Sequence, residues 1–289
     1  MKKSAFIYII SACIFWGTSG IFVEYLAPFG FSSPQMTFVR GTVAFVCMLL
    51  YVLIRDINLF KTNLKELLFF MGSGLAFYFT ATCYFQSMQL TSVSTAVVLM
   101  YTAPIFVMIY SVTFLDEKLT KTKLIALVTM LIGCGLVSGI IGGLKFNVLG
   151  IAIGFMSGIS YAAYNILTKI QMQKGINPVK ANLYCFLFSI IIGLFLSNPY
   201  GIPSLISQNP LFTVSLCTGM GIFACILPYF LYSTALRYIP AGTASSLGII
   251  EPMSATIFSV LILGEEPSIY LLVGIALVLG AVFLLGKNN

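Results

Sequence analysis

The chain contains no histidine, and only 8% of its 289 residues are charged. Histidine is the usual acid or base near neutral pH and the commonest metal ligand, so its absence excludes histidine-based catalysis and imidazole metal sites. Soluble domains carry about 25% charged residues. Here 59% of the residues are hydrophobic and the mean hydropathy is +1.03, more apolar surface than a water-soluble fold can hide. The composition predicts an all-α membrane protein.

Two motifs with chemical roles are also missing: the sequence has no CxxC pair and no GxxxxGK[ST] phosphate loop. The seven cysteines all fall in apolar runs, so we expect small buried side chains with no disulfide and no metal role. The missing phosphate loop argues against intrinsic ATP hydrolysis. Since paired acids or a nucleophile with its base are also lacking, we expect no enzyme and no cofactor.

The apolar runs predict ten transmembrane helices, at about 20 residues per crossing. They are expected at Ser4–Ala27, Pro34–Ile54, Leu64–Met88, Ser94–Leu115, Thr122–Ile140, Val148–Ile170, Lys180–Ser197, Phe212–Arg237, Thr243–Gly264 and Ser268–Gly286. Turn-forming glycine, proline and asparagine residues separate the runs.

The basic residues indicate how the chain lies in the membrane. If the N-terminus is cytoplasmic, the predicted connections place only Lys145 on the outer side, Arg40 lies within the second helix, and all other Lys and Arg fall on the inner side. This asymmetry predicts cytoplasmic N- and C-termini in the plasma membrane. It also explains the net charge of +7 as topology, so nucleic acid is not an expected partner.

An internal repeat is visible because Ser94–Thr120 aligns without a gap on Gly242–Ser268. Each segment has a proline and, thirteen residues later, a glutamate at the end of the apolar run. The pairs are Pro104 with Glu117 and Pro252 with Glu265. The fourth predicted helix therefore corresponds to the ninth.

The repeat divides the chain into two halves, 1–145 and 146–289, with five predicted helices each. Because five is an odd number, the halves would have opposite orientations, which is an inverted-topology repeat. Pro104, Pro228 and Pro252 are predicted to bend the fourth, eighth and ninth helices, since proline removes a backbone donor.

Several short motifs occur in a characteristic order along the chain. They are Phe15–Gly17, Arg40, Pro104 with Glu117–Thr120, Tyr238–Ala241, Glu251–Pro252 and Leu263–Glu265. In these motifs the chain resembles the drug/metabolite transporter superfamily, EamA type. The resemblance implies a ten-helix inverted-repeat carrier with a central cavity. Members move small organic solutes, often outward, and differ widely in cargo.

Glu251 is the leading functional candidate because it lies near the middle of an apolar segment. A carboxylate at that depth costs at least about 2.5 kcal/mol. Pro252 follows it and is expected to leave the Gly248 carbonyl as a spare acceptor. Glu251 can bind a cationic group or carry a proton; alternatively, it is a structural carboxyl bonded to a neighbouring helix. Its repeat counterpart is Ala103, and this asymmetry favours a functional role.

Aromatic and polar side chains in the apolar runs are candidates for the solute site, because aromatic walls hold planar or cationic solutes. The candidates are Trp16, Tyr78, Gln86, Tyr101, Tyr161, Asn165 and Tyr229, with Tyr84, Tyr164 and Tyr232 in the same regions. The alternative for each is helix packing.

Two further pairs of charged residues carry structural expectations. Glu24 and Arg40 are predicted near the outer face as an ion pair or outer latch, although Arg40 can also attract anionic cargo. Glu117 and Glu265 are assigned to turns, where a carboxylate can bind the first amides of the next helix.

A GxxxGxxxG face at Gly150, Gly154 and Gly158 predicts close helix contact, within the bundle or in a homodimer.

Together these features predict a secondary transporter. We expect export of a small amphipathic or cationic organic metabolite or amino acid by alternating access through a central cavity. Proton coupling through Glu251 is the accompanying hypothesis. The alternative is a channel or uniporter-like carrier in which Glu251 is structural. The expected partners are the solute, membrane lipid and protons.

Overall fold

The computed structural model describes residues 2–91, 96, 99–116, 118–137, 147–263 and 269–287, and every regular element in these ranges is helical. In the first half of the chain the helices are α1 (Lys2–Gly17), α2 (Ser19–Leu26), α3 (Ser33–Arg55), α4 (Leu64–Leu90), α6 (Ala103–Phe114) and α7 (Lys121–Val137), with short 3₁₀ turns η1 (Ala27–Phe29) and η2 (Ile57–Phe60).

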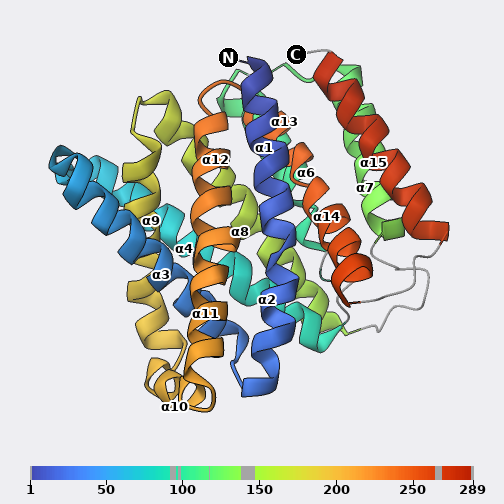
Figure 1. The fold of residues 1–289 in the computed structure, drawn as a ribbon. Coiled ribbons are helices and arrows are strands. Elements are labelled where there is room, and N and C mark those ends of the chain that lie inside the picture. The colour runs from blue at the N-terminus through green and yellow to red at the C-terminus, as the bar shows by residue number, and fades with distance from the viewer. Residues whose placement is uncertain are drawn as a thin grey trace.

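In the second half they are α8 (Val148–Gln173), α9 (Pro178–Leu196), α10 (Ile202–Ile206), α11 (Pro210–Gly221), α12 (Leu227–Ala235), α13 (Ala241–Leu247), α14 (Ile250–Phe258) and α15 (Ile269–Lys287). A 3₁₀ turn, η4 (Pro199–Gly201), precedes α10, and π-helical segments η5 (Ile222–Ile226) and η6 (Ser259–Leu263) follow α11 and α14. The two chain ends lie at one end of the bundle and α10 lies at the other (Figure 1).

Seven helices in the described residues are long and apolar enough to cross a membrane. They are Ser4–Phe29, Ser33–Arg55, Leu64–Ser87, Val148–Gln173, Pro178–Leu196, Pro210–Ala235 and Ala241–Ile262. Two shorter apolar helices lie at Ala103–Phe114 and Leu272–Ala281. Each of the ten predicted segments contains a described helix, whereas the crossing of the membrane by all ten stays a prediction.

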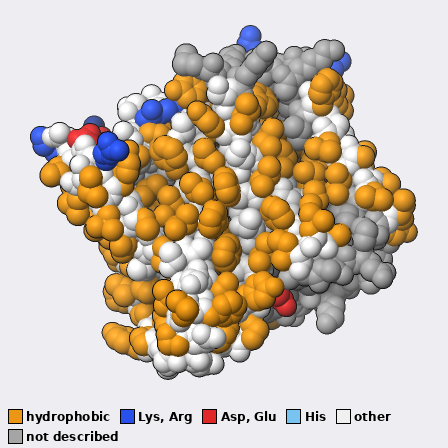
Figure 2. Space-filling model, in the orientation of Figure 1, with side chains coloured by type: hydrophobic (Ala, Val, Ile, Leu, Met, Phe, Trp, Pro, Cys, Tyr) orange, Lys and Arg blue, Asp and Glu red, His pale blue; other side chains and the backbone are white. Residues whose placement is uncertain are grey.

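The surface of the bundle is strongly apolar. Many large hydrophobic side chains are exposed on it, among them Phe195 and Leu211, which are 82% and 83% exposed. On the face in Figure 2, hydrophobic side chains cover the middle of the molecule and the visible Lys and Arg lie toward the end that carries both chain ends. Water could not cover such a surface without large cost, so lipid is its natural solvent.

The main helix contacts join the two halves of the chain. The contacts are α4 with α8, α1 with α12, α6 with α8, α1 with α14, α3 with α9, α6 with α13 and α7 with α15; the last pair stands together at the edge of Figure 1. If each helix is replaced by its counterpart in the other half, each of these contacts becomes another contact of the same set or itself. The contact of the third predicted helix with the sixth becomes that of the eighth with the first. The contact of the fourth with the sixth becomes that of the ninth with the first. Such exchange is the contact pattern of a two-fold related repeat.

The glycine face of α8 packs inside the bundle. A Cβ atom at Gly158 would lie 2.8 Å from the Leu99 carbonyl oxygen, and one at Gly154 would lie 2.7 Å from the Ser87 Oγ. The Ser87 hydroxyl also donates to the Gly150 carbonyl at 2.8 Å. Of the two predicted roles of this face, the structure therefore assigns it to helix contact within one chain.

Helices α1 and α14 also approach at a glycine. A Cβ atom at Gly17 would lie 2.8 Å from the Cβ atom of Ser254 and 2.9 Å from the backbone nitrogen of Ala255. Only a residue without a side chain permits this separation. The contact places Trp16, the neighbour of Gly17, beside the helix that carries Glu251.

Candidate functional site

The predicted ninth helix is interrupted immediately before Glu251. Helix α13 ends at Leu247 and α14 begins at Ile250. In the interruption the Glu251 amide donates to the Gly248 carbonyl at 2.9 Å. The expectation of a spare Gly248 carbonyl was therefore wrong, because the break lets the amide three residues later replace the donor that Pro252 lacks. The acidic side chain sits in the first turn of a helix, where the helix dipole favours negative charge.

The other two prolines also lie at the start of helical segments. Pro104 is the second residue of α6, and Pro228 is the second residue of α12. Before Pro228 the chain forms the π-helical η5, in which the Leu227 amide donates to the Ile222 carbonyl. A proline in the first turn of α6 costs no helical hydrogen bond, because those amides have no partner within the helix. At the three positions where bends were predicted, the chain changes helix type or breaks.

The Glu251 side chain lies deep in the bundle but keeps some accessible surface. The Tyr101 hydroxyl lies close to the carboxyl group but does not reach hydrogen-bond geometry with it. Tyr84, Tyr161 and Arg40 are close enough to interact with it electrostatically. In the described part of the chain the one salt bridge joins other residues, so Glu251 is not ion-paired.

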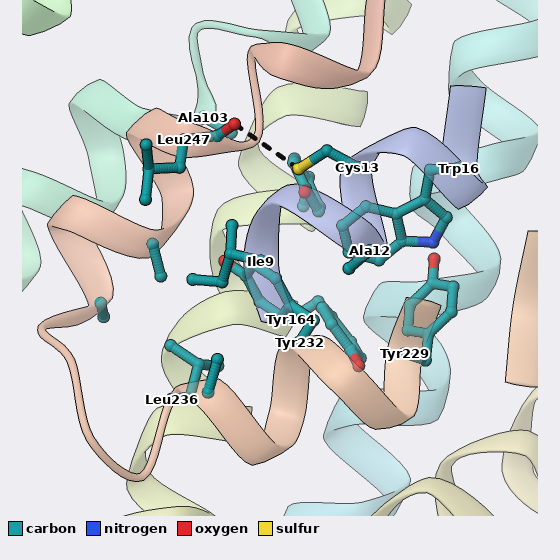
Figure 3. Close-up of a cluster of buried hydrophobic side chains, with 14 of the residues drawn as sticks. Ile9, Ala12, Cys13, Trp16, Ala103, Tyr164, Tyr229, Tyr232, Leu236 and Leu247 are labelled. Carbon is teal, nitrogen blue, oxygen red and sulfur yellow. Dashed lines mark hydrogen bonds between the residues drawn. The ribbon is translucent and has the colours of Figure 1, made fainter. Parts of the chain in front are cut away.

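An aromatic cluster surrounds Trp16 on α1, and we define it as Trp16, Tyr161, Tyr164, Tyr229 and Tyr232. The Trp16 ring centre lies 5.0 Å from that of Tyr229, 5.3 Å from Tyr232 and 6.5 Å from Tyr161. Tyr164 joins through Tyr229 at 5.3 Å. Figure 3 labels Trp16, Tyr164, Tyr229 and Tyr232, and the residues of the cluster belong to α1, α8 and α12. The cluster therefore lies where three helices from both halves meet.

Many polar atoms in and beside this cluster are buried without a hydrogen-bond partner. They are the Trp16 Nε1, the hydroxyls of Tyr101, Tyr161, Tyr164 and Tyr232, and both polar atoms of the Asn165 side chain. Buried polar groups in folded proteins are nearly always paired, because leaving one unpaired costs about 1–3 kcal/mol. So dense a group of polar atoms makes this part of the interior the candidate site for a polar ligand.

Arg40 on α3 is part of this interior. Its side chain is only 7% exposed, its guanidinium carbon lies 5.2 Å from the centre of the Phe77 ring, and its Nε has no hydrogen-bond partner. Glu24 instead has an exposed side chain on α2. No ion pair joins the two in the structure as described, so the predicted outer pair is not formed. Arg40 thus faces inward, where the Phe77 ring can stabilise its positive charge.

The structure brings together most of the predicted solute residues and separates two of them. Trp16, Tyr161 and Tyr229 lie in the aromatic cluster, with Tyr101 beside Glu251 and Asn165 buried on α8. The two separated residues are on α4. The Tyr78 hydroxyl is hydrogen-bonded to Ser197 Oγ at 2.8 Å, and the Gln86 side chain is exposed.

Phe77 is the site residue that the sequence did not reveal. Its ring lies 4.9 Å from Tyr229 and 5.5 Å from Phe186. It precedes Tyr78 directly, both side chains are buried, and hydropathy cannot tell which of two adjacent aromatic residues contacts the aromatic cluster. The turn glutamates Glu117 and Glu265 lie outside the described residues, as does Lys145.

At the end of the bundle that carries the chain ends, basic side chains form hydrogen bonds between the α8–α9 region and the α12–α13 region. The Lys169 ammonium donates to the Leu236 carbonyl at 2.9 Å and to the Ile239 carbonyl at 2.7 Å. The Arg237 Nη2 donates to the Ile176 carbonyl at 2.9 Å. A side chain of α8 therefore binds carbonyls of the connection between α12 and α13. A side chain of that connection in turn binds a carbonyl of the connection between α8 and α9.

An apolar helical bundle with a partly unsatisfied polar interior is the architecture of a membrane transport protein. A family model for the EamA-like transporter family matches residues 3–139 and 148–287. The chain belongs to this family, as the sequence motifs predicted, and has its two-repeat architecture. It is therefore an integral membrane protein that transports a small-molecule solute, and the family and its relatives are transporters and not enzymes.

The curated relatives that match the chain are also transporters, and the matches extend over nearly the whole length of both proteins. An uncharacterized transporter of Archaeoglobus fulgidus is 27% identical, with 96% of this chain and 94% of the relative covered. One of Clostridium kluyveri is 26% identical, covering 99% and 94%. The uncharacterized transporter YwfM of Bacillus subtilis is 28% identical, covering 94% and 90%. A protein crystal structure with 16% sequence identity shares the fold at a TM-score of 0.80, covering 98% of this chain and 96% of the other.

Proposed function

We propose that the chain is a secondary carrier that exports a small amphipathic organic solute with a cationic group, in exchange for protons, by alternating access. The observation that carries the proposal is the position of Glu251. It is a carboxyl group at the start of α14, beside the aromatic cluster, and it forms no salt bridge with any residue that the structure describes. A cation is held there by the carboxylate and by the ring faces, which attract positive charge.

Proton coupling follows from competition at one carboxyl group. The cationic solute binds the ionised form of Glu251, and a proton neutralises that form, so the site holds either one or the other. Return of the protonated site is the easier step, because a buried charge without a counter-ion is costly. The family resemblance favours export.

For the membrane orientation we propose two inverted five-helix repeats, 1–145 and 146–289, with both chain ends in the cytoplasm of the plasma membrane. The exchangeable helix contacts support the repeat. The visible Lys and Arg in Figure 2 lie toward the end of the bundle that carries both chain ends, which supports the orientation. Opening toward the cytoplasm then requires the bonds made by Lys169 and Arg237 to break.

The test uses the purified full chain in liposomes without ATP and phenyltrimethylammonium as the probe, since this cation cannot carry a proton itself. An outward proton gradient should drive probe uptake, and a higher external pH should raise the initial rate by freeing Glu251 for the cation. Glu251→Gln should abolish both effects. Asp116→Asn, which removes an exposed acid, should leave them unchanged.

Other outcomes assign the chain differently. Uptake that proceeds equally in the wild type and in Glu251→Gln, with the same pH dependence, would make Glu251 structural and the protein a uniporter-like carrier. Flux that does not saturate with probe concentration would indicate a channel.

A further inference from the structure

Lys169 is buried near the end of α8, and its side chain binds a segment far away in the sequence. It is 8% exposed, and its ammonium group donates to the Leu236 carbonyl at 2.9 Å and to the Ile239 carbonyl at 2.7 Å. Both carbonyls belong to the connection between α12 and α13. A buried ammonium group is costly unless its donors are bound. The position of Lys169 and the position of this connection therefore depend on each other.

Helix α13 lies where two groups of packed helices meet. All seven of its residues, Ala241–Leu247, are buried, and it packs on α6, α8 and α1. These neighbours belong to different groups, since α8 packs mainly on α4 whereas α1 packs mainly on α12. In Figure 1, α13 lies toward the end of the bundle that carries both chain ends. It therefore closes the interior between the two groups at that end.

Helix α8 contacts α13 at both of its ends. Before α13 begins, Lys169 binds the Ile239 carbonyl, and Pro240 is the N-cap of α13. After it ends, the Tyr161 hydroxyl would lie 3.3 Å from a Cβ atom at Gly248, the C-cap. At 1.5 Å per residue, Tyr161 and Lys169 are about 12 Å apart along α8, and α13 is about 10.5 Å long. The two lengths match, so α13 fits between these two side chains of α8.

The far end of α13 covers the interior beside Glu251. The Cys13 thiol of α1 donates to the Leu247 carbonyl at 3.5 Å, as the dashed line in Figure 3 marks, and Cys13 is fully buried. Glu251 follows after the interruption, in the first turn of α14. Movement of α13 away from α1 would uncover the Cys13 sulfur. It would also open a route from this end of the bundle toward Glu251.

We propose that Lys169 is a positioning residue for transport, whose bonds to the α12–α13 connection hold α13 in the closed position until they break and the interior opens to the cytoplasm. The assignment rests on the proposed function, which supplies alternating access and the orientation. Ammonium–carbonyl bonds suit this role because they are strong enough to shift a two-state equilibrium and can be replaced by bonds to water. The bond from Arg237 to the Ile176 carbonyl supports the same closed position.

The experiment uses Cys13 as a reporter in the full chain. Right-side-out and inside-out membrane vesicles are treated with a membrane-impermeant methanethiosulfonate, and modification of Cys13 is followed by peptide mass spectrometry. A buried thiol reacts only when water and reagent reach it, so the rate reports the fraction of protein open to the treated side. Lys169→Met should raise the rate from the cytoplasmic side about tenfold or more, because a hydrogen bond to a charged donor is worth at least that ratio. The rate from the outer side should not rise.

Three variants separate this role from general stability. Lys169→Arg keeps a charged donor, so its rate should stay nearer to the wild type than that of Lys169→Met. Lys174→Met removes an exposed lysine at the end of the same helix and should change nothing. Arg237→Gln removes an exposed side chain that binds the Ile176 carbonyl and should raise the cytoplasmic rate by a smaller factor. If Lys169→Met does not fold, Arg237→Gln decides, and an unchanged rate in it would then contradict the proposal.

Three results with folded Lys169→Met would overturn the assignment. They are a cytoplasmic rate equal to that of Lys174→Met, a rate that rises equally from both sides, as in a loosened fold, and a rise from the outer side only. The proposed function fails separately, because the labelling needs neither solute nor proton. It fails when Glu251→Gln leaves probe uptake and its pH dependence unchanged, whatever the rate at Cys13.

Discussion

Replacing Gly17 with alanine tests the contact on which the position of Glu251 depends. The new Cβ atom would lie 2.8 Å from the Ser254 Cβ and 2.9 Å from the Ala255 nitrogen. Carbon atoms prefer about 3.5–4.0 Å, and neither neighbour is the end of a flexible side chain. Helix α1 or α14 must therefore move. Overpacking of this kind costs about 1–3 kcal/mol.

Gly20→Ala is the matched control, because a Cβ atom at Gly20 meets nothing within 4 Å. Alanine favours a helix over glycine by up to about 1 kcal/mol, and this gain largely cancels when the two variants are compared. Gly17→Ala should thus be less stable than Gly20→Ala by about 1–3 kcal/mol in the free energy of unfolding, measured in mixed micelles. It should also transport more slowly, because α14 is displaced. Equal stability of the two variants would refute the close approach of α1 and α14.

Two other substitutions test the remaining contacts. Lys169→Met removes two hydrogen bonds from a charged donor, each worth about 1.5–3 kcal/mol, and leaves the Leu236 and Ile239 carbonyls unpaired; it should lower the melting temperature, whereas Lys121→Met at an exposed position should not. Gly158→Leu should lower the melting temperature without changing the oligomeric state seen by light scattering, because this face packs within one chain. A stable Gly158→Leu protein that changes from dimer to monomer would contradict that assignment.

The sequence was sufficient for the features that depend on composition and periodicity. The apolar runs located the long helices because a membrane requires about 20 apolar residues per crossing, and every described α-helix except the short α10 overlaps a predicted segment. The motif order gave the family correctly. Trp16 and Glu251 could be singled out because each is unusual inside an apolar run.

Contacts between distant helices could not be predicted in the same way. A proline signals a bend, but it did not predict that the ninth helix breaks between Leu247 and Ile250, where Gly248 packs near Tyr161. The pairing of Glu24 with Arg40 was inferred from depth in the membrane alone. The direction in which Arg40 points depends on the Phe77 ring of another helix, and the sequence of one helix carries no information about that neighbour.

The interleaved contacts have a consequence for how the chain is made. Helices α1, α3, α4, α6 and α7 each find a main partner in the second half of the chain, on α12, α9, α8, α13 and α15. The repeat of the sequence is therefore not a unit of folding, and a half expressed alone would leave its inner faces uncovered. During synthesis the helices of the first half enter the membrane before their partners exist, so the bundle assembles only when the last helices have left the ribosome.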